Sequence, residues 1–335
     1  MNNVIIGNDI PSLLMAYHIS KNGEKVFLFN SNDCFGGFMY EEAFGSYYLY
    51  DNIYIAKIFN EIDLKYHIRS IISMVLYNKE LMLLDYGIAN FPDLKEKYVK
   101  QFYSYLKKNE IETAMNLSNG KLKNIFVFNK YEFLGKIMKY LIDNGVSIIN
   151  QEIEVINLKR KIIETKLRAY CYKKLLYVDN IKLLSKLLID NSESKDIIKN
   201  NICYINNDMK VIKIKVFYCP DNITWDFVYF VDENSGGVKR LTNNHNKTFT
   251  FEIKSPYVES DFLYSIIELL FQKKDNFQII GTQNIPGNIV PNDFYDNYVI
   301  DYFDKREFYL FGRYATLRHK EMMNVTMEDF SERFK

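Results

Sequence analysis

The stretch VIIGNDIPSLLMAYHISKNGEKVFLFN, residues 4–30, decides the fold. Val4 to Ile6 is a short apolar, β-branched run, which is typical of a buried parallel strand. Pro11 falls in the first turn of the helix that we expect next, where its missing N–H costs nothing, and Gly23 marks the end of that helix. Val26 to Phe29 predicts a second strand. The order of strand, turn, helix and strand indicates an α/β domain built on a parallel sheet.

The turn between this strand and helix has the position of the G-x-G-x-x-G turn of dinucleotide-binding domains. There, backbone N–H groups and the positive helix end hold a diphosphate, and the glycines allow a tight turn, a close approach and close packing. This chain has Gly7, Asp9 and Ser12 at those three positions. An Asp9 carboxylate about 4 Å from a phosphate charge would be repelled by roughly 4 kcal/mol at an effective dielectric near 20. Alternatively, Asp9 turns back and caps the helix.

The residue after the second strand is the one that binds the ribose hydroxyls in such domains, and it is usually acidic. Asn30 holds this position here, and Gly36-Gly37 follow it. An amide can accept one hydrogen bond and donate another, so we expect a loss of only about 1–2 kcal/mol relative to a carboxylate. Gly36 and Gly37 allow the backbone to approach a cofactor, although a Gly-Gly pair is equally an ordinary turn.

Composition excludes several classes of function. The chain has 335 residues, of which 48% are hydrophobic and 25% charged. Its net charge is only +1, so the protein has no overall positive electrostatic field that would attract nucleic acid. Its four cysteines form no C-x-x-C pair, which argues against a metal site or a disulfide framework. We find no signal peptide and no apolar run long enough to span a membrane, and we therefore expect a cytoplasmic protein.

The rest of the chain divides into three predicted parts. Helical patterns dominate after residue 50, period-two strands such as MKVIKIKVFYC and KTFTFEIK follow residue 200, and a strand with a helix closes the chain. We expect a Rossmann-like dinucleotide-binding domain assembled from residues 1–50, 130–200 and 300–335. Residues 51–129 are expected to be a mainly helical insertion, and residues 201–299 an antiparallel β-sheet domain that binds substrate. The predicted fold class is α/β.

Four segments, in order along the chain, resemble the FAD-binding superfamily of amine oxidases, protoporphyrinogen oxidases and UDP-galactopyranose mutases. They are the opening through Gly37, KYEFLGKIMKYLIDNGVSIINQEIEVINL (130–158), WDFVYFVDENSGGVKRLTNNHN (225–246) and FYLFGRYATLRHKEMMNVTMEDF (308–330). The last is similar to the superfamily's closing GRfGxWxYxxMdxxI. Ala315 and Leu317 depart from that pattern, as they replace a Gly and a Trp.

The resemblance implies a set of site residues. Those expected to contact the cofactor are Gly7, Asp9, Ser12, Asn30, Gly36, Gly37, Gly312, Arg313 and Met322. No catalytic residue is evident, and the candidates are Arg240 and His319. Arg240 matches an arginine that faces substrate phosphates in mutase-like members, and the alternative is an exposed charge at the end of a hairpin. His319 near a flavin would move protons, and the alternative is a solvated first-turn histidine.

The resemblance also implies a function. The chain would be a flavoprotein that binds FAD and acts through it, as a mutase or an oxidoreductase, on a nucleotide sugar or a related small molecule. The closing GRYATLRHKEMM favours the mutase side. The alternative is a flavin-free relative of the same fold, as Rab GDP-dissociation inhibitors are, serving as a protein- or lipid-binding or structural module.

Overall fold

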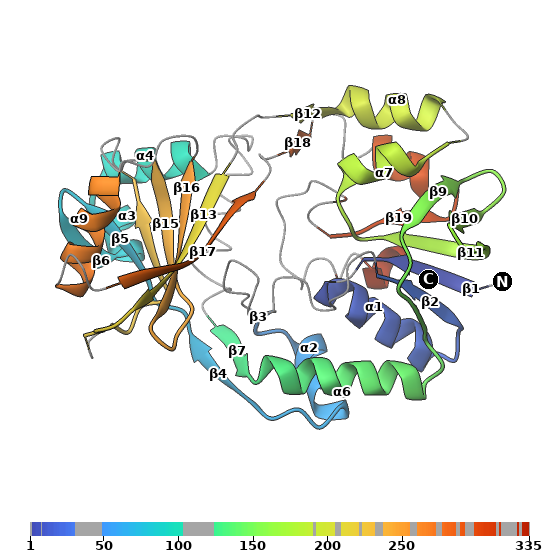
Figure 1. The fold of residues 1–335 in the computed structure, drawn as a ribbon, viewed down its shortest axis with the longest axis horizontal. Helices are drawn as coiled ribbons and strands as arrows, with labels where there is room; N and C mark the ends of the chain where they lie inside the picture. Colours follow the sequence, from blue (N-terminus) through green and yellow to red (C-terminus); the bar gives the residue numbers. More distant parts are fainter. Residues whose placement is uncertain are drawn as a thin grey trace.

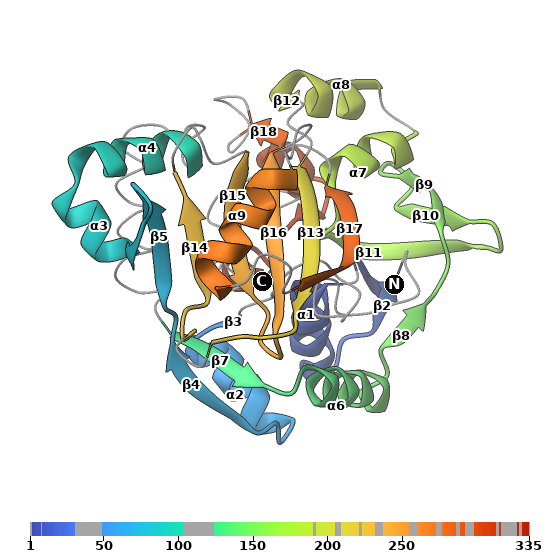
Figure 2. The ribbon, with the colours of Figure 1, turned by 60° about the vertical axis from the view of Figure 1, so that its left-hand side comes forward.

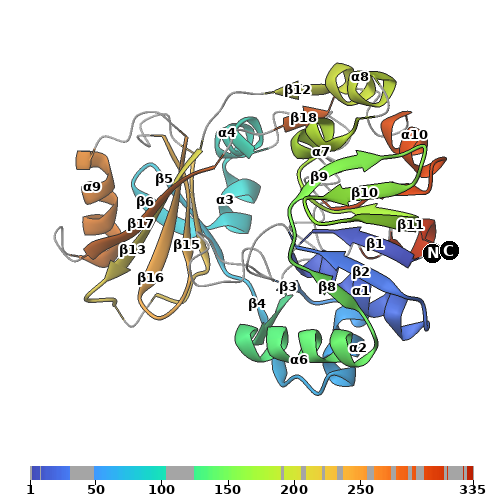
Figure 3. The same ribbon diagram turned by 45° about the vertical axis from the view of Figure 1, so that its right-hand side comes forward.

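The fold is seen in a computed structural model (Figure 1). It describes residues 2–7, 9–30, 49–102, 124–189, 192–204, 209–220, 223–231, 237–254, 260–272, 277–285, 289–291, 298–312, 315, 327 and 330–334. A mainly parallel sheet lies on one side of the molecule and a large antiparallel sheet on the other, as Figures 1 and 3 both show.

The parallel sheet is built from segments that are far apart in the sequence. Its strands have the order β8-β2-β1-β11, with β19 pairing the far side of β11. They are β1 (Asn2–Ile6), β2 (Val26–Phe29), β8 (Ser147–Ile149), β11 (Ala169–Tyr177) and β19 (Phe308–Leu310). The first part of β11 continues into an antiparallel meander with β10 (Ile162–Thr165) and β9 (Ile153–Asn157). All five parallel strands therefore end at the same edge.

Helices cover both faces of this sheet. One apolar cluster joins β1 and β2 to α1 (Ile10–Lys21), α2 (Ile53–Glu61) and α6 (Lys130–Asp143). Helix α6 forms because Asn129 caps its start and because Phe133, Ile137 and Leu141 recur every four residues on its buried face. A second cluster packs the other face against α7 (Ile181–Leu187), α8 (Ser192–Asn201) and α10 (Ile300–Asp304).

The antiparallel sheet has the order β17-β13-β16-β15-β14-β5-β6. Its strands are β5 (Ser73–Tyr77), β6 (Glu80–Leu83), β13 (Met209–Val216), β14 (Phe227–Phe230), β15 (Val238–Asn243), β16 (Thr248–Lys254) and β17 (Phe277–Ile285). Figure 2 shows α9 (Ser260–Phe271) lying across this sheet, and α3 (Leu84–Asn90) and α4 (Pro92–Phe102) beside β5. Alternate apolar residues pack beneath α9, as the sequence pattern predicts.

Two small sheets complete the described structure. One has the order β3-β7-β4, from β3 (Leu49–Tyr50), β7 (Asn124–Phe128) and β4 (Tyr66–Ser70). The other pairs β12 (Ile202–Tyr204) with β18 (Ile289–Pro291). None of the helices in the described ranges is both long and apolar enough to cross a lipid bilayer.

The predicted α/β class is confirmed, with a Rossmann-like parallel sheet and a separate antiparallel sheet. The secondary structure of residues 51–129 differs from the mainly helical expectation, since β4, β5, β6 and β7 lie there beside α2, α3 and α4. A two-residue turn, Asn78-Lys79, joins β5 to β6, with φ of 50° and 67°. Hairpin turns with two positive φ values usually carry Asn-Gly, and lysine in place of glycine hides this hairpin in the sequence. The division into three domains stays a prediction.

Candidate functional site

The candidate site is the edge at which the parallel strands end. Gly7 follows β1, Asn30 follows β2, and Gly312 lies two residues beyond β19. The chain proceeds from β1 to β2 and β8 in one direction, while β11 and β19 lie on the other side of β1. Open α/β sheets bind ligands outside the strand ends at such a reversal. The structure thus brings the described members of the predicted cofactor set to this edge.

Gly7 forms the tight turn that the sequence predicts. Its N–H donates to the carbonyl of Phe29 at 3.2 Å, and its φ is +153°. A Cβ atom at this position would lie 2.4 Å from the Oγ of Ser12 and 3.1 Å from the Cβ of Val178. No side chain fits here, because α1 and the end of β11 both pack directly against the turn.

Asp9 turns back onto its own helix. Its backbone is extended (φ −86°, ψ 177°), and its Oδ1 accepts hydrogen bonds from the N–H of Ser12 at 3.1 Å and the Oγ of Ser12 at 2.7 Å. The first three amides of a helix lack partners within it. Here Pro11 has no N–H, and that of Ser12 is taken by Asp9. Only the N–H of Ile10 is left from the three, so the cap replaces much of the backbone cradle that an anion would use.

The Asp9 carboxyl group is in an unfavourable place for a charge. Burial raises its pKa to about 6, the nearby carboxylate of Asp179 adds to the rise, and the hydrogen bonds from Ser12 oppose it. Asp179 comes two residues after β11, and its Oδ1 accepts from the N–H of Asn180 at 2.6 Å. Two carboxyl groups therefore approach the helix end where a dinucleotide domain holds its phosphates.

Asn30 and Gly312 flank the turn. The side chain of Asn30 is buried, its N–H donates to the carbonyl of Ile149 at 3.0 Å, and its Nδ2 lies 3.5 Å from the Oδ1 of Asn150. Gly312 has a φ of +80°, and a Cβ there would lie 3.1 Å from the Cγ1 of Val178. Both residues lie at the same edge of the sheet as Gly7, and their contact with a cofactor stays a prediction.

Five predicted site residues lie outside the described residues: Gly36, Gly37, Arg313, His319 and Met322. Their predicted roles are carried forward as proposals.

Arg240, the other catalytic candidate, lies within the antiparallel sheet. It is on β15, opposite Glu252 on β16, and its Nε donates to the Oε1 of Glu252 at 3.0 Å. Its guanidinium carbon lies 5.2 Å from the centre of the Phe227 ring. These contacts hold the side chain against its own sheet, and among the described residues they link it to none of the residues at the edge of the parallel sheet.

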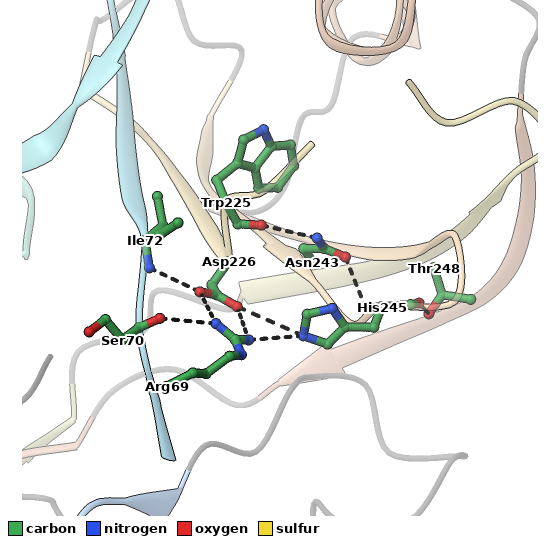
Figure 4. Close-up of polar contacts among 8 residues, drawn as sticks. All are labelled: Arg69, Ser70, Ile72, Trp225, Asp226, Asn243, His245 and Thr248. Atoms are coloured by element: carbon green, nitrogen blue, oxygen red, sulfur yellow. Dashed lines mark hydrogen bonds and ion pairs between the residues drawn. The ribbon is translucent and has the colours of Figure 1, made fainter. Parts of the chain in front are cut away.

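A polar cluster that the sequence did not reveal joins two sheets (Figure 4). Arg69, the fourth residue of β4, donates to both carboxylate oxygens of Asp226 at 2.8 and 2.5 Å, and the N–H of Ile72 donates to the same carboxylate at 2.9 Å. The Nε2 of His245 lies 3.2 Å from Arg69. Burial and the charge of Arg69 hold the pKa of His245 below its usual range, so the ring is neutral at pH 7. This cluster fastens β4 to the start of β14.

A surface hollow lies elsewhere on the parallel sheet. Its lining comes from the beginnings of β1 and β11 and from β8, and Arg168 stacks there on Tyr170 at 4.7 Å from the ring centre. It shares none of the predicted cofactor residues, so the edge near Gly7 remains the candidate site.

The residues at this edge fit FAD when the Asp9 carboxyl group is protonated. Gly7 forms the tight turn, and the Asn30 amide is a polar partner for a ribose. Gly312 has no side chain, so a cofactor could approach the backbone closely there. An ionised Asp9 conflicts with a diphosphate, because it adds negative charge beside the phosphates. A protonated Asp9 removes that conflict, since its carbonyl oxygen still caps Ser12 while its O–H can donate to a phosphate oxygen.

No protein-family model and no curated protein matches the sequence of this chain. Solved structures do match its fold. A reduced UDP-galactopyranose mutase superposes with a TM-score of 0.70 over 99% of this chain and 94% of its own, at 13% identity. The resemblance in fold predicted from the sequence is confirmed.

Two other structures are similar over their whole length. An oxidoreductase from Methanosarcina mazei has a TM-score of 0.71, 14% identity and full coverage of both chains. The cyclohexylamine oxidase from Brevibacterium oxydans has a TM-score of 0.64 and 9% identity, with 99% of each chain covered. At these identities the matches establish the fold alone, with 99–100% of this chain covered by each of the three structures.

Proposed function

We propose that this protein binds FAD at the carboxyl edge of its parallel sheet and is a flavin-dependent oxidoreductase or mutase. The observation that supports the proposal most is the convergence of Gly7, Asn30 and Gly312, which follow three different strands, at one edge of the sheet. The whole-length likeness to oxidase and mutase structures is consistent with it.

In this proposal each described residue has a binding role. Gly7 lets the backbone turn sharply beneath the diphosphate, and the Asn30 side chain forms hydrogen bonds with the ribose. Gly312 allows the flavin ring to approach the backbone closely. Bound FAD supplies the redox or nucleophilic chemistry. Arg240 and His319 stay candidates for contact with the substrate, which we propose to be a nucleotide sugar or a related small molecule.

A second candidate function is favoured by the helix cap. Asp9 and Pro11 together take away two of the three amides that would hold a diphosphate. A flavin-free relative of this fold, serving as a protein- or lipid-binding or structural module, would have no need of those amides. FAD binding by the folded protein separates the two functions.

We expect Asn30→Asp to strengthen FAD binding about tenfold, because a carboxylate accepts from both ribose hydroxyls and a charged acceptor adds roughly 1–2 kcal/mol over a neutral one. The measurement is the dissociation constant from quenching of FAD fluorescence. The matched control is Asn60→Asp, the same change at an exposed position of α2, which should leave the constant within about twofold of the unmodified protein. Equal constants for both variants would count against Asn30 as the ribose partner.

A further inference from the structure

The Asp9 carboxyl group lies near another negative charge, and no positive charge among the described residues offsets it. Of the elements that meet at this turn, β11 contributes Asp179, whereas the neutral Asn30 and Gly312 follow β2 and β19. The first turn of α1 carries no acidic residue, and its basic residues, His18 and Lys21, are in its last turn. Among the described residues, no cationic side chain is found to act on the Asp9 carboxyl group.

A bound diphosphate would make this environment more negative still. Each phosphate charge disfavours the ionised form of Asp9 further, so the bound state favours the acid. Protonated Asp9 still caps α1, because its carbonyl oxygen can accept hydrogen bonds from the N–H and the Oγ of Ser12. Its O–H then becomes a donor at the helix end, in partial replacement of the amide that Pro11 lacks.

We propose that Asp9 contacts the diphosphate of FAD as a carboxylic acid, so that FAD binding to the protein with ionised Asp9 takes up one proton. The inference rests on the proposed function. It means that the protonation state of Asp9 determines at which pH the dinucleotide binds. Binding is then strong in mildly acidic solution and weak above neutrality.

The expected size of the effect follows from linkage. With the pKa of Asp9 in the free protein at about 6, the affinity falls roughly tenfold for each pH unit above that value. The dissociation constant for FAD should therefore rise roughly fifty-fold between about pH 6 and about pH 8. Below the pKa of the free protein the affinity should level off.

The test compares three forms of the full chain: the unmodified protein, Asp9→Asn and the control Asp143→Asn, which removes an exposed carboxylate at the end of α6. FAD affinity is measured by fluorescence quenching across the pH range, and proton uptake by calorimetry in two buffers of different ionisation enthalpy. Asparagine caps a helix as well as aspartate does, and it carries no titrating group. Asp9→Asn should bind FAD with nearly constant affinity and take up no proton, while Asp143→Asn should keep the fifty-fold change.

Each outcome decides a different claim. A constant affinity without proton uptake in the unmodified protein would overturn the role of Asp9 and leave FAD binding intact. Absence of FAD binding at every pH, by folded unmodified protein and folded Asp9→Asn alike, would overturn the proposed function and this inference with it. If Asp9→Asn does not fold, uptake of about one proton per FAD by the unmodified protein at about pH 8 still supports the inference, and zero uptake at that pH contradicts it.

Discussion

Asp226→Ala should lower the free energy of unfolding by about 3–5 kcal/mol, the largest loss that we expect from a single substitution. The Asp226 side chain is 1% exposed and receives three hydrogen bonds, two from Arg69 and one from the N–H of Ile72. Its removal takes the carboxylate partner from a partly buried guanidinium and the acceptor from the N–H of Ile72. Urea denaturation followed by circular dichroism measures the loss.

The matched comparison for this ion pair is the double variant Arg69→Met with Asp226→Leu. Replacing both charged partners by apolar groups avoids an unpaired buried charge, so it should cost clearly less than Asp226→Ala alone. If Asp226→Ala lowers the free energy of unfolding by less than about 1 kcal/mol, the ion pair does not fasten β4 to β14.

Gly7→Ala should cost about 3 kcal/mol of stability and weaken FAD binding as well. The new Cβ would lie 2.4 Å from the Oγ of Ser12, and the φ of +153° is one that residues with a side chain rarely adopt. Relief requires either the Ser12 side chain to rotate out of its hydrogen bond with Asp9 or α1 to move away from the end of β1, and both changes disturb the turn beneath the proposed diphosphate. The same denaturation and fluorescence measurements test both effects.

Gly135→Ala is the control for that change. Gly135 lies within α6, and a Cβ there would meet no atom within 4 Å. Alanine in an open helical position is favoured over glycine, so this variant should gain about 0.5–1 kcal/mol. Similar losses in both variants would contradict the account of the Gly7 turn.

Local patterns predicted the opening of the chain well. The apolar runs around Val4 and Val26, with the helix between them, form β1, α1 and β2, because short-range periodicity determines such elements. The residue type at position 9 was compatible with two orientations, toward a phosphate or back to the helix. The structure shows the second, and the reason is the hydrogen bonds to Ser12.

Long-range pairing could not be predicted in the same way. Arg69 and Asp226 are 157 residues apart, and neither lies in a pattern that indicates a partner. Strand β5 joins β14 in parallel, across a similar separation, and together with β6 it extends a sheet whose remaining strands come from residues after 200. Such contacts depend on how whole sheets are placed, and the spacing of residues within one segment does not specify that placement.

The proposed function requires the edge next to Gly7, Asn30 and Gly312 to bind FAD. The most direct measurement is the visible absorption spectrum of the protein after incubation with excess FAD at about pH 5.5 and gel filtration in the same buffer. We expect flavin bands that correspond to one FAD per chain. A folded protein that emerges without flavin absorption, both as the unmodified chain and as Asp9→Asn, would contradict it.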